Sequence, residues 1–126
     1  MDFDYCHRHN PEQFYDYVFA FEILEHIMNP LGFLEFVRHS LKDQGRVFLS
    51  TPFIRPRFLW SKYHITEYYP DKVEELAAKA GLTVVRYKRV NVYPFKSGLL
   101  GIRPLFRLWF ERIMLFEMVK TASLRP

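Results

Sequence analysis

The sequence predicts an α/β fold in which apolar strands alternate with amphipathic helices. Residues 15–21 form an aromatic and β-branched run that is typical of a strand. Two segments that begin at Pro30 and Pro70 repeat apolar residues at helical spacing, and each is followed by a glycine and a strand-like run. Because 126 residues suffice for one modest core, we expect a single, partial domain over residues 1–126.

Composition excludes several classes of protein. Nearly half of the residues are apolar and 18% are aromatic, which argues against intrinsic disorder. The net charge of +4 comes from scattered Lys and Arg, a pattern that indicates a solvated basic surface and no nucleic acid partner. The lone Cys6 excludes an internal disulfide. No signal peptide or membrane-spanning run is visible, so we expect a cytoplasmic protein.

The first expected strand ends in a cluster of ionisable side chains. Residues 1–13 read as an irregular arm, in which His7 and His9 are surface residues. The strand that follows, Tyr15–Phe21, is apolar enough to be buried on both faces. Glu22, Glu25 and His26 come next at i, i+3, i+4 spacing, so one helical turn would place them on the same side. These groups would then lie at the carboxyl end of a strand, where open α/β sheets bind ligands.

A capped helix and a second strand come next. Asn29 is a plausible N-cap with Pro30 at the first helical position, and Gly45 is expected to stop the helix. Residues 46–50 read as an apolar strand that ends at Thr51-Pro52, again where a ligand would bind.

Residues 53–63 form an aromatic, basic loop, for which two interpretations are equally good. The loop either packs on its own apolar side chains or covers a substrate, as loops on rigid scaffolds often do.

A second helix and an edge strand follow. The helix begins at Pro70 and should end at Gly81, but Tyr69 leaves it without a side-chain N-cap. Residues 82–92 alternate in polarity and carry several basic residues, which favours a strand at or near a sheet edge: Arg86, Lys88 and Arg89.

Residues 93–126 carry an aromatic stretch that resembles an amphipathic helix, with Arg103, Arg107 and Glu111 at four-residue spacing. This helix could lie on a membrane surface, but we favour docking on the sheet. Residues 116–122 are the expected last strand.

Several of these motifs resemble the class I S-adenosylmethionine-dependent methyltransferases, in particular the methyltransferase-domain subgroup that includes ubiquinone-pathway O-methyltransferases. The resemblance rests on the order and spacing of four strings: Tyr15-Asp16-Tyr17-Val18, Glu22-Ile23-Leu24-Glu25-His26, Asn29-Pro30 and Gly45-Arg46-Val47-Phe48-Leu49-Ser50-Thr51-Pro52.

The resemblance implies a partial Rossmann-like sheet. It begins at about Phe14, and residues 14–92 carry the matching α/β pattern. The first strand here resembles the fourth of the family, so we expect strands four, five, seven and six in that order, with strand seven antiparallel and helices on both faces. The chain then represents the C-terminal half of the domain, and its first strand has an open apolar edge that favours self-association or pairing with a missing N-terminal half.

The resemblance also implies S-adenosylmethionine as cofactor and a small-molecule or lipid-like oxygen acceptor. By position in the fold, Ala20, Phe21 and Glu22 would contact the cofactor, and Thr51, Pro52 and Phe53 the substrate. The glycines are at positions 32, 45, 81, 98 and 101, and none forms the glycine-rich turn that lets the backbone approach a cofactor. We therefore expect the isolated chain to bind the cofactor weakly or not at all and to be inactive alone.

The ionisable cluster has two interpretations. The E-x-x-E-H string resembles the metal-binding positions of ubiquinone-pathway O-methyltransferases and of small-RNA 2′-O-methyltransferases. This implies a Mg²⁺ or Mn²⁺ site made of Glu22, Glu25, His26 and His64. Alternatively, these residues shape the pocket, which we favour because a short motif specifies a metal weakly. His26 or His64 could also act as a general base.

A second hypothesis from another class is a non-catalytic interaction module. It would bind a protein partner or a membrane through the open sheet edge or the aromatic C-terminal helix.

Overall fold

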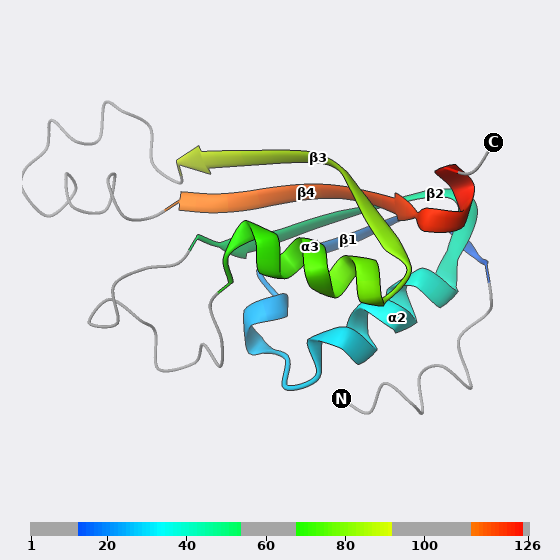
Figure 1. Ribbon diagram of the computed structural model, residues 1–126, viewed down its shortest axis with the longest axis horizontal. Coiled ribbons are helices and arrows are strands. Elements are labelled where there is room, and N and C mark those ends of the chain that lie inside the picture. The colour runs from blue at the N-terminus through cyan, green and yellow to red at the C-terminus, as the bar shows by residue number, and fades with distance from the viewer. Residues whose placement is uncertain (1–12, 54–67, 92–111, 125–126) are drawn as a thin grey trace, which may run out of the picture.

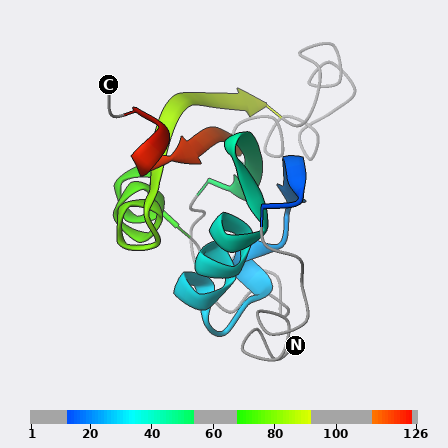
Figure 2. The same cartoon turned by 90° about the vertical axis from the view of Figure 1, so that its right-hand side faces the viewer.

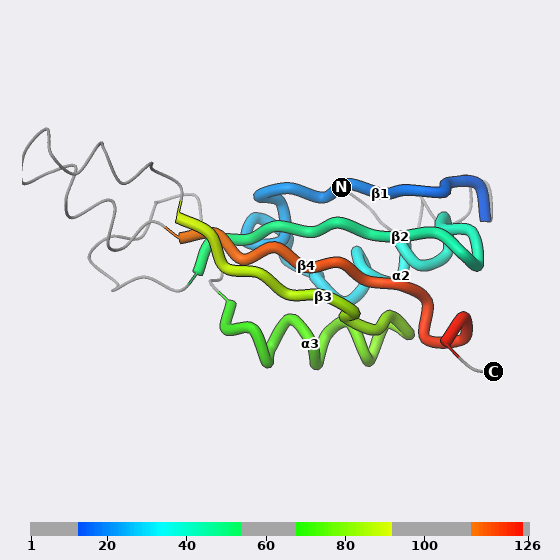
Figure 3. The backbone as a smooth tube through the Cα atoms, turned by 90° about the horizontal axis from the view of Figure 1, so that it is seen from above, coloured from blue at the N-terminus to red at the C-terminus, as the bar shows by residue number. Residues whose placement is uncertain are grey.

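The computed structural model describes residues 13–53, 68–91 and 112–124. These residues form one four-stranded mixed sheet with two α-helices and two short 3₁₀ turns (Figure 1). The strand order is β1-β2-β4-β3, as Figure 3 shows from above. This order and the α/β class confirm the predicted sheet of strands four, five, seven and six. No helix in the described part of the chain is long and apolar enough to cross a membrane.

The first two strands run parallel and end side by side. β1 (Tyr15–Phe21) pairs with β2 (Leu41–Pro52), and the register sets Val18 opposite Val47 and Phe21 opposite Ser50. Among the described strands, β1 pairs with β2 alone, so it is an edge strand, as expected. The carboxyl ends of both strands therefore meet at the same end of the sheet.

The last strand lies inside the sheet. β4 (Arg112–Lys120) is antiparallel to both β2 and β3 (Leu82–Asn91), which confirms the expected antiparallel strand. β4 begins four residues earlier than the sequence predicts. β3 forms the other edge, where its basic side chains were predicted to be.

Both α-helices begin as predicted. In α2 (Pro30–Ser40) the Asn29 side chain accepts a hydrogen bond from the Gly32 N–H at 2.9 Å. α3 (Pro70–Lys79) has Tyr69 at its N-cap, and this residue makes no side-chain cap bond. Gly81 follows α3 with φ +78°, the left-handed conformation that ends helices.

The end of α2 differs from the prediction. We expected Gly45 to stop this helix, but α2 ends at Ser40, and Gly45 lies within β2. The cause is the burial of Leu41, whose side chain packs against Gly45. A Cβ at position 45 would be only 2.7 Å from the Leu41 side chain, so glycine is needed there for close packing.

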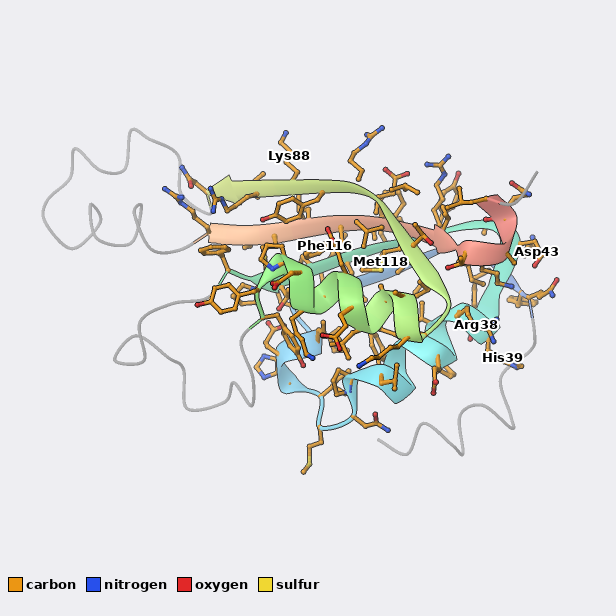
Figure 4. The ribbon with its side chains drawn as sticks, in the orientation of Figure 1. Arg38, His39, Asp43, Lys88, Phe116 and Met118 are labelled. Carbon is orange, nitrogen blue, oxygen red and sulfur yellow. The ribbon has the colours of Figure 1, made fainter. Side chains whose placement is uncertain are left out.

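The core lies between one face of the sheet and the two helices. Figure 2 shows α2 and α3 next to each other on the same side of the sheet. The sheet contributes inward side chains from β2 and β4: Val47, Leu49, Met114, Phe116 and Met118. Figure 4 shows Phe116 and Met118 directed toward the helices and Lys88 directed away from them.

The opposite side of the sheet, here called the open face, carries exposed aromatic residues. Tyr17, Phe19 and Phe21 of β1 are 59%, 63% and 56% exposed. The prediction that β1 is buried on both faces is therefore wrong, because both described helices pack on the other side. Helices on both faces were expected, but both described helices lie on one face, and the helix predicted around residues 103–111 lies outside the described residues.

Several other predictions also fall outside the described part of the chain. These are the arm with Cys6, His7 and His9, the loop from residue 54 to 63, His64, and the stretch from residue 92 to 111.

Candidate functional site at the ends of β1 and β2

Glu22 and Ser50 join the carboxyl ends of β1 and β2. The Glu22 N–H donates to the Ser50 carbonyl and to Ser50 Oγ, both at 3.1 Å. Ser50 Oγ in turn donates to Glu22 Oε1 at 2.7 Å. Glu22 has φ +51°. This left-handed conformation is energetically unfavourable for any residue that has a side chain. The hydrogen bonds to Ser50 hold the chain in this turn and leave the Glu22 carboxylate at the solvent-exposed tip of the sheet.

Glu25 lies beneath this tip and is almost fully buried. Its side chain belongs to the 3₁₀ turn η1 (Leu24–His26) and is 1% exposed. The hydroxyl of Thr51 donates to Glu25 Oε2 at 3.2 Å. Burial raises the pKa of the Glu25 carboxyl above its usual value, and the neighbouring Glu22 carboxylate raises it further. Hydrogen bonds from the backbone and from Thr51 oppose this increase.

The expected grouping of Glu22, Glu25 and His26 on one side of a helical turn is wrong. The turn begins only at Leu24, so Glu22 lies before it, at a positive φ. Glu25 points into the protein, whereas the side chain of His26 is 41% exposed and its Nε2 lies 3.9 Å from Glu25 Oε1. The i, i+3, i+4 spacing assumed an α-helix that the short 3₁₀ turn does not provide.

This arrangement does not support the predicted metal site. Within the described ranges, no three His, Cys, Asp or Glu side chains are placed to hold a metal ion. His64, the fourth predicted ligand, lies outside those ranges. The donor chemistry also fits poorly. Glu25 already accepts a hydrogen bond from the Thr51 hydroxyl, and its burial favours the protonated carboxyl, which is a weak metal ligand.

The residues predicted to contact cofactor and substrate lie at these strand ends, but they differ in exposure. Ala20 is buried under the sheet, and Phe21 is exposed on the open face. Thr51 and Pro52 are buried, so in this structure they support the strand ends. Phe53 is half-buried, and the Arg89 guanidinium lies 4.9 Å from its ring centre. Their contacts with cofactor and substrate stay predictions.

Ser50 is the member of this site that the sequence analysis did not assign. The signal was present, because Ser50 ends an apolar strand whose carboxyl end was predicted to bind a ligand. Its partner Glu22 lies 28 residues away, and only the register between β1 and β2 brings the two together.

A hollow of about 260 Å³ lies beside the strand ends, on the open face. The aromatic rings of β1 and β2 line one side of it and the basic residues of β3 the other: Phe19, Phe21 and Phe48, opposite Arg86 and Lys88. Phe21 thus connects the hollow with the tip that carries Glu22.

Comparisons with known proteins agree with this fold. The 1,6-didemethyltoxoflavin-N1-methyltransferase of Burkholderia thailandensis, solved with bound 1,6-didemethyltoxoflavin and S-adenosylhomocysteine, superposes with a TM-score of 0.66 at 16% identity. The O-methyltransferase of a trans-AT PKS multienzyme from Brevibacillus brevis, bound to S-adenosylhomocysteine, gives 0.64 at 17% identity. A methyltransferase in complex with the Haloferax volcanii Trm112 activator gives 0.66 at 14% identity.

These matches cover nearly all of this chain but about half of each neighbour. The covered shares are 92%, 94% and 89% of this chain, against 48%, 48% and 56% of the three neighbours. No curated protein sequence is significantly similar to the chain.

The family comparison covers more than half of the sequence. Residues 2–87 match the family described as "Methyltransferase domain". This range includes β1, the Glu22–Ser50 connection, both helices and most of β3. The chain belongs to the methyltransferase domain family.

Proposed function

We propose that this chain is the C-terminal half of an S-adenosylmethionine-dependent methyltransferase domain, and that the ends of β1 and β2 form one wall of its donor site. The observation that carries the proposal is the Glu22–Ser50 connection, which fixes an exposed carboxylate where two parallel strands end. Open α/β sheets bind ligands at this place. Neighbours with the same fold were solved with S-adenosylhomocysteine, which supports this choice of cofactor.

The proposed reaction moves a methyl group from the sulfonium of the cofactor to an oxygen of a small-molecule or lipid-like acceptor. The C–S bond breaks, a C–O bond forms, and the oxygen loses its proton, leaving S-adenosylhomocysteine. Orientation of the oxygen against the methyl group supplies most of the catalysis in this proposal. Glu22 would accept hydrogen bonds from ligand hydroxyls, Glu25 and Thr51 would hold the tip in place, and the exposed His26 is the candidate base.

The chain would supply this wall without the glycine-rich turn that cradles the cofactor. Its length is about half that of the solved methyltransferases it resembles. We therefore propose that residues outside positions 1–126 complete the site, and that the chain alone binds the cofactor only at millimolar concentration.

Chemical-shift perturbation in the isotope-labelled chain tests this function. Added S-adenosylhomocysteine should shift the amides of residues 20–22 and 50–52 in a saturable way. The substitution Glu22→Gln should weaken the response, whereas Glu74→Gln on the exposed side of α3 should not. Unchanged amides at the strand ends at millimolar ligand would contradict the proposal.

The second candidate is a non-catalytic interaction module, which the exposed aromatic residues of the open face favour. A chain that binds a protein or lipid vesicles but shows no response to S-adenosylhomocysteine would support this alternative.

A further inference from the structure

We propose that the open face is a docking surface for an amphipathic helix of a partner polypeptide, with acidic residues along one side of the helix's apolar stripe. This surface lies beside the strand ends and does not depend on cofactor binding there. Its apolar half comes from β1 and β2, and its basic half comes from β3.

The apolar half is an ordered group of aromatic rings. The ring of Phe19 stacks on that of Phe48 with 5.3 Å between their centres, and Tyr17 lies 6.4 Å from Phe48. Phe19 also contacts Phe21, at 5.8 Å. Contiguous exposed apolar side chains with charged residues beside them are a feature of interaction sites.

The basic half is held in place by one buried acid. Glu117 of β4 is 8% exposed and forms ion pairs with both Arg46 and Arg86. Two arginines thus share a single carboxylate, which leaves one positive charge in excess. Lys88, next to Arg86 on the same face of β3, adds a second positive charge.

The two halves lie on either side of the strand β4. The hollow of about 260 Å³ has Leu115 and Glu117 of the central strand β4 between its aromatic and basic sides. A helix lying along β4 would place its apolar side chains against Phe19, Phe48 and Leu115, and one polar flank over Arg86 and Lys88. Sheets with parallel strands are normally covered by helices on both faces, and here the described helices cover only one.

Charge argues for a separate, acidic occupant. A second copy of the chain, stacked face to face, would bring the same excess of basic residues against this surface. Between Ile102 and Met114 the chain itself carries three basic residues and one acidic residue, so the net charge of this aromatic stretch is also unfavourable: Arg103, Arg107 and Arg112 against Glu111. An acidic flank satisfies both basic side chains of β3.

This occupant is consistent with the comparisons. The solved methyltransferases are about twice as long as this chain. The remaining half of such a domain would therefore be a source of a helix that covers the open face. The docking proposal therefore extends the proposed function, but it rests on the open face alone.

Two synthetic peptides provide the test. Both are about five turns long, with leucines at i, i+3, i+4 and i+7 spacing, and one flank carries Glu in the first peptide and Lys in the second. Fluorescence anisotropy should show that the Glu peptide binds at least about tenfold more tightly, and that added salt reduces the difference by screening.

Variants of exposed residues identify the surface without unfolding the protein. Phe19→Ser should weaken binding of the Glu peptide at least about tenfold, whereas Met28→Ser, a change at an 88% exposed residue outside the open face, should leave it unchanged. Lys88→Glu cancels the excess positive charge of this surface, so in this variant the preference for the Glu peptide should disappear.

Equal affinity of the natural chain for the two peptides would overturn the proposal, and so would full affinity of Phe19→Ser for the Glu peptide. A stable dimer in sedimentation equilibrium that excludes the Glu peptide would identify a second copy as occupant, and preferential binding to phosphatidylserine vesicles would identify a membrane. Either result would also overturn it. Because the peptides are expected to bind the open face and not the tip that carries Glu22, neither outcome depends on the response to S-adenosylhomocysteine.

Discussion

Ser50 connects two strands through a single hydroxyl, and this makes its contribution measurable. In Ser50→Ala the Glu22 carboxylate loses a donor at 2.7 Å, and the Glu22 N–H loses one of its two acceptors. We expect the free energy of unfolding to fall by about 1–2 kcal/mol. Urea denaturation checks this, with Ser123→Ala near the C-terminus as the control for a hydroxyl that donates locally, to the Lys120 carbonyl, and does not connect two strands. In a cycle with Glu22→Ala, strict additivity of the two effects would mean that the pair does not interact.

Glu25 predicts a dependence of stability on pH. Its pKa is raised in the folded chain from the usual value of 4.5, mainly by burial, so the folded state favours the protonated carboxyl. The resulting stability is fully present below about pH 4.5 and is lost as the pH rises through the folded pKa.

The variant Glu25→Gln should not show this loss, because its amide stays neutral. The difference in unfolding free energy between the variant and the natural chain should therefore move in the variant's favour as the pH rises from 4.5 toward neutrality. Denaturation curves over this range measure the difference, with Glu74→Gln as an exposed control. A difference that is constant with pH would contradict the raised pKa.

At the scale of elements, α3 has a correctable defect at its N-terminus. Tyr69 has extended backbone angles suited to an N-cap, but it makes no side-chain cap bond. Tyr69→Ser should supply an acceptor for the first turn and raise the free energy of unfolding by about 1 kcal/mol. Tyr69→Ala serves as the matched control, since it removes the ring without supplying a cap. Equal stability of the two variants would show that the cap bond does not form.

Local sequence predicts the starts of both helices and the glycine that follows α3, for a physical reason. The Asn29 cap, the prolines that begin both helices and Gly81 at φ +78° act through neighbours a few residues away. The end of α2 was predicted wrongly because Leu41 and Gly45 are determined by core packing, which spacing along the chain does not reveal.

At the scale of the whole molecule, the sequence predicted the strand order but not the exposure of β1. The order followed from the resemblance to a known family, and β4 lies between β2 and β3 as expected. An aromatic run such as Tyr15–Phe21 has the same composition whether one face or two are covered. Only the three-dimensional arrangement, with α2 and α3 on one side, shows that Tyr17, Phe19 and Phe21 remain exposed.

The candidate site could likewise be predicted only in part from the sequence. The sequence placed ionisable groups at the end of β1, and Glu22 does lie there. The assignment of roles failed where it assumed an α-helical turn, since Glu25 is directed inward and bonded to Thr51. Ser50 became part of the site only through the pairing of strands that are distant in sequence.

The central claim is that the ends of β1 and β2 face the methyl donor. Ultraviolet photolabelling of the chain with methyl-tritiated S-adenosylmethionine, followed by peptide mapping, tests it most directly. We expect the label in the peptide that contains residues 20–22, and we expect excess S-adenosylhomocysteine to prevent it. Labelling confined to other peptides, or labelling that S-adenosylhomocysteine does not reduce, would contradict the account.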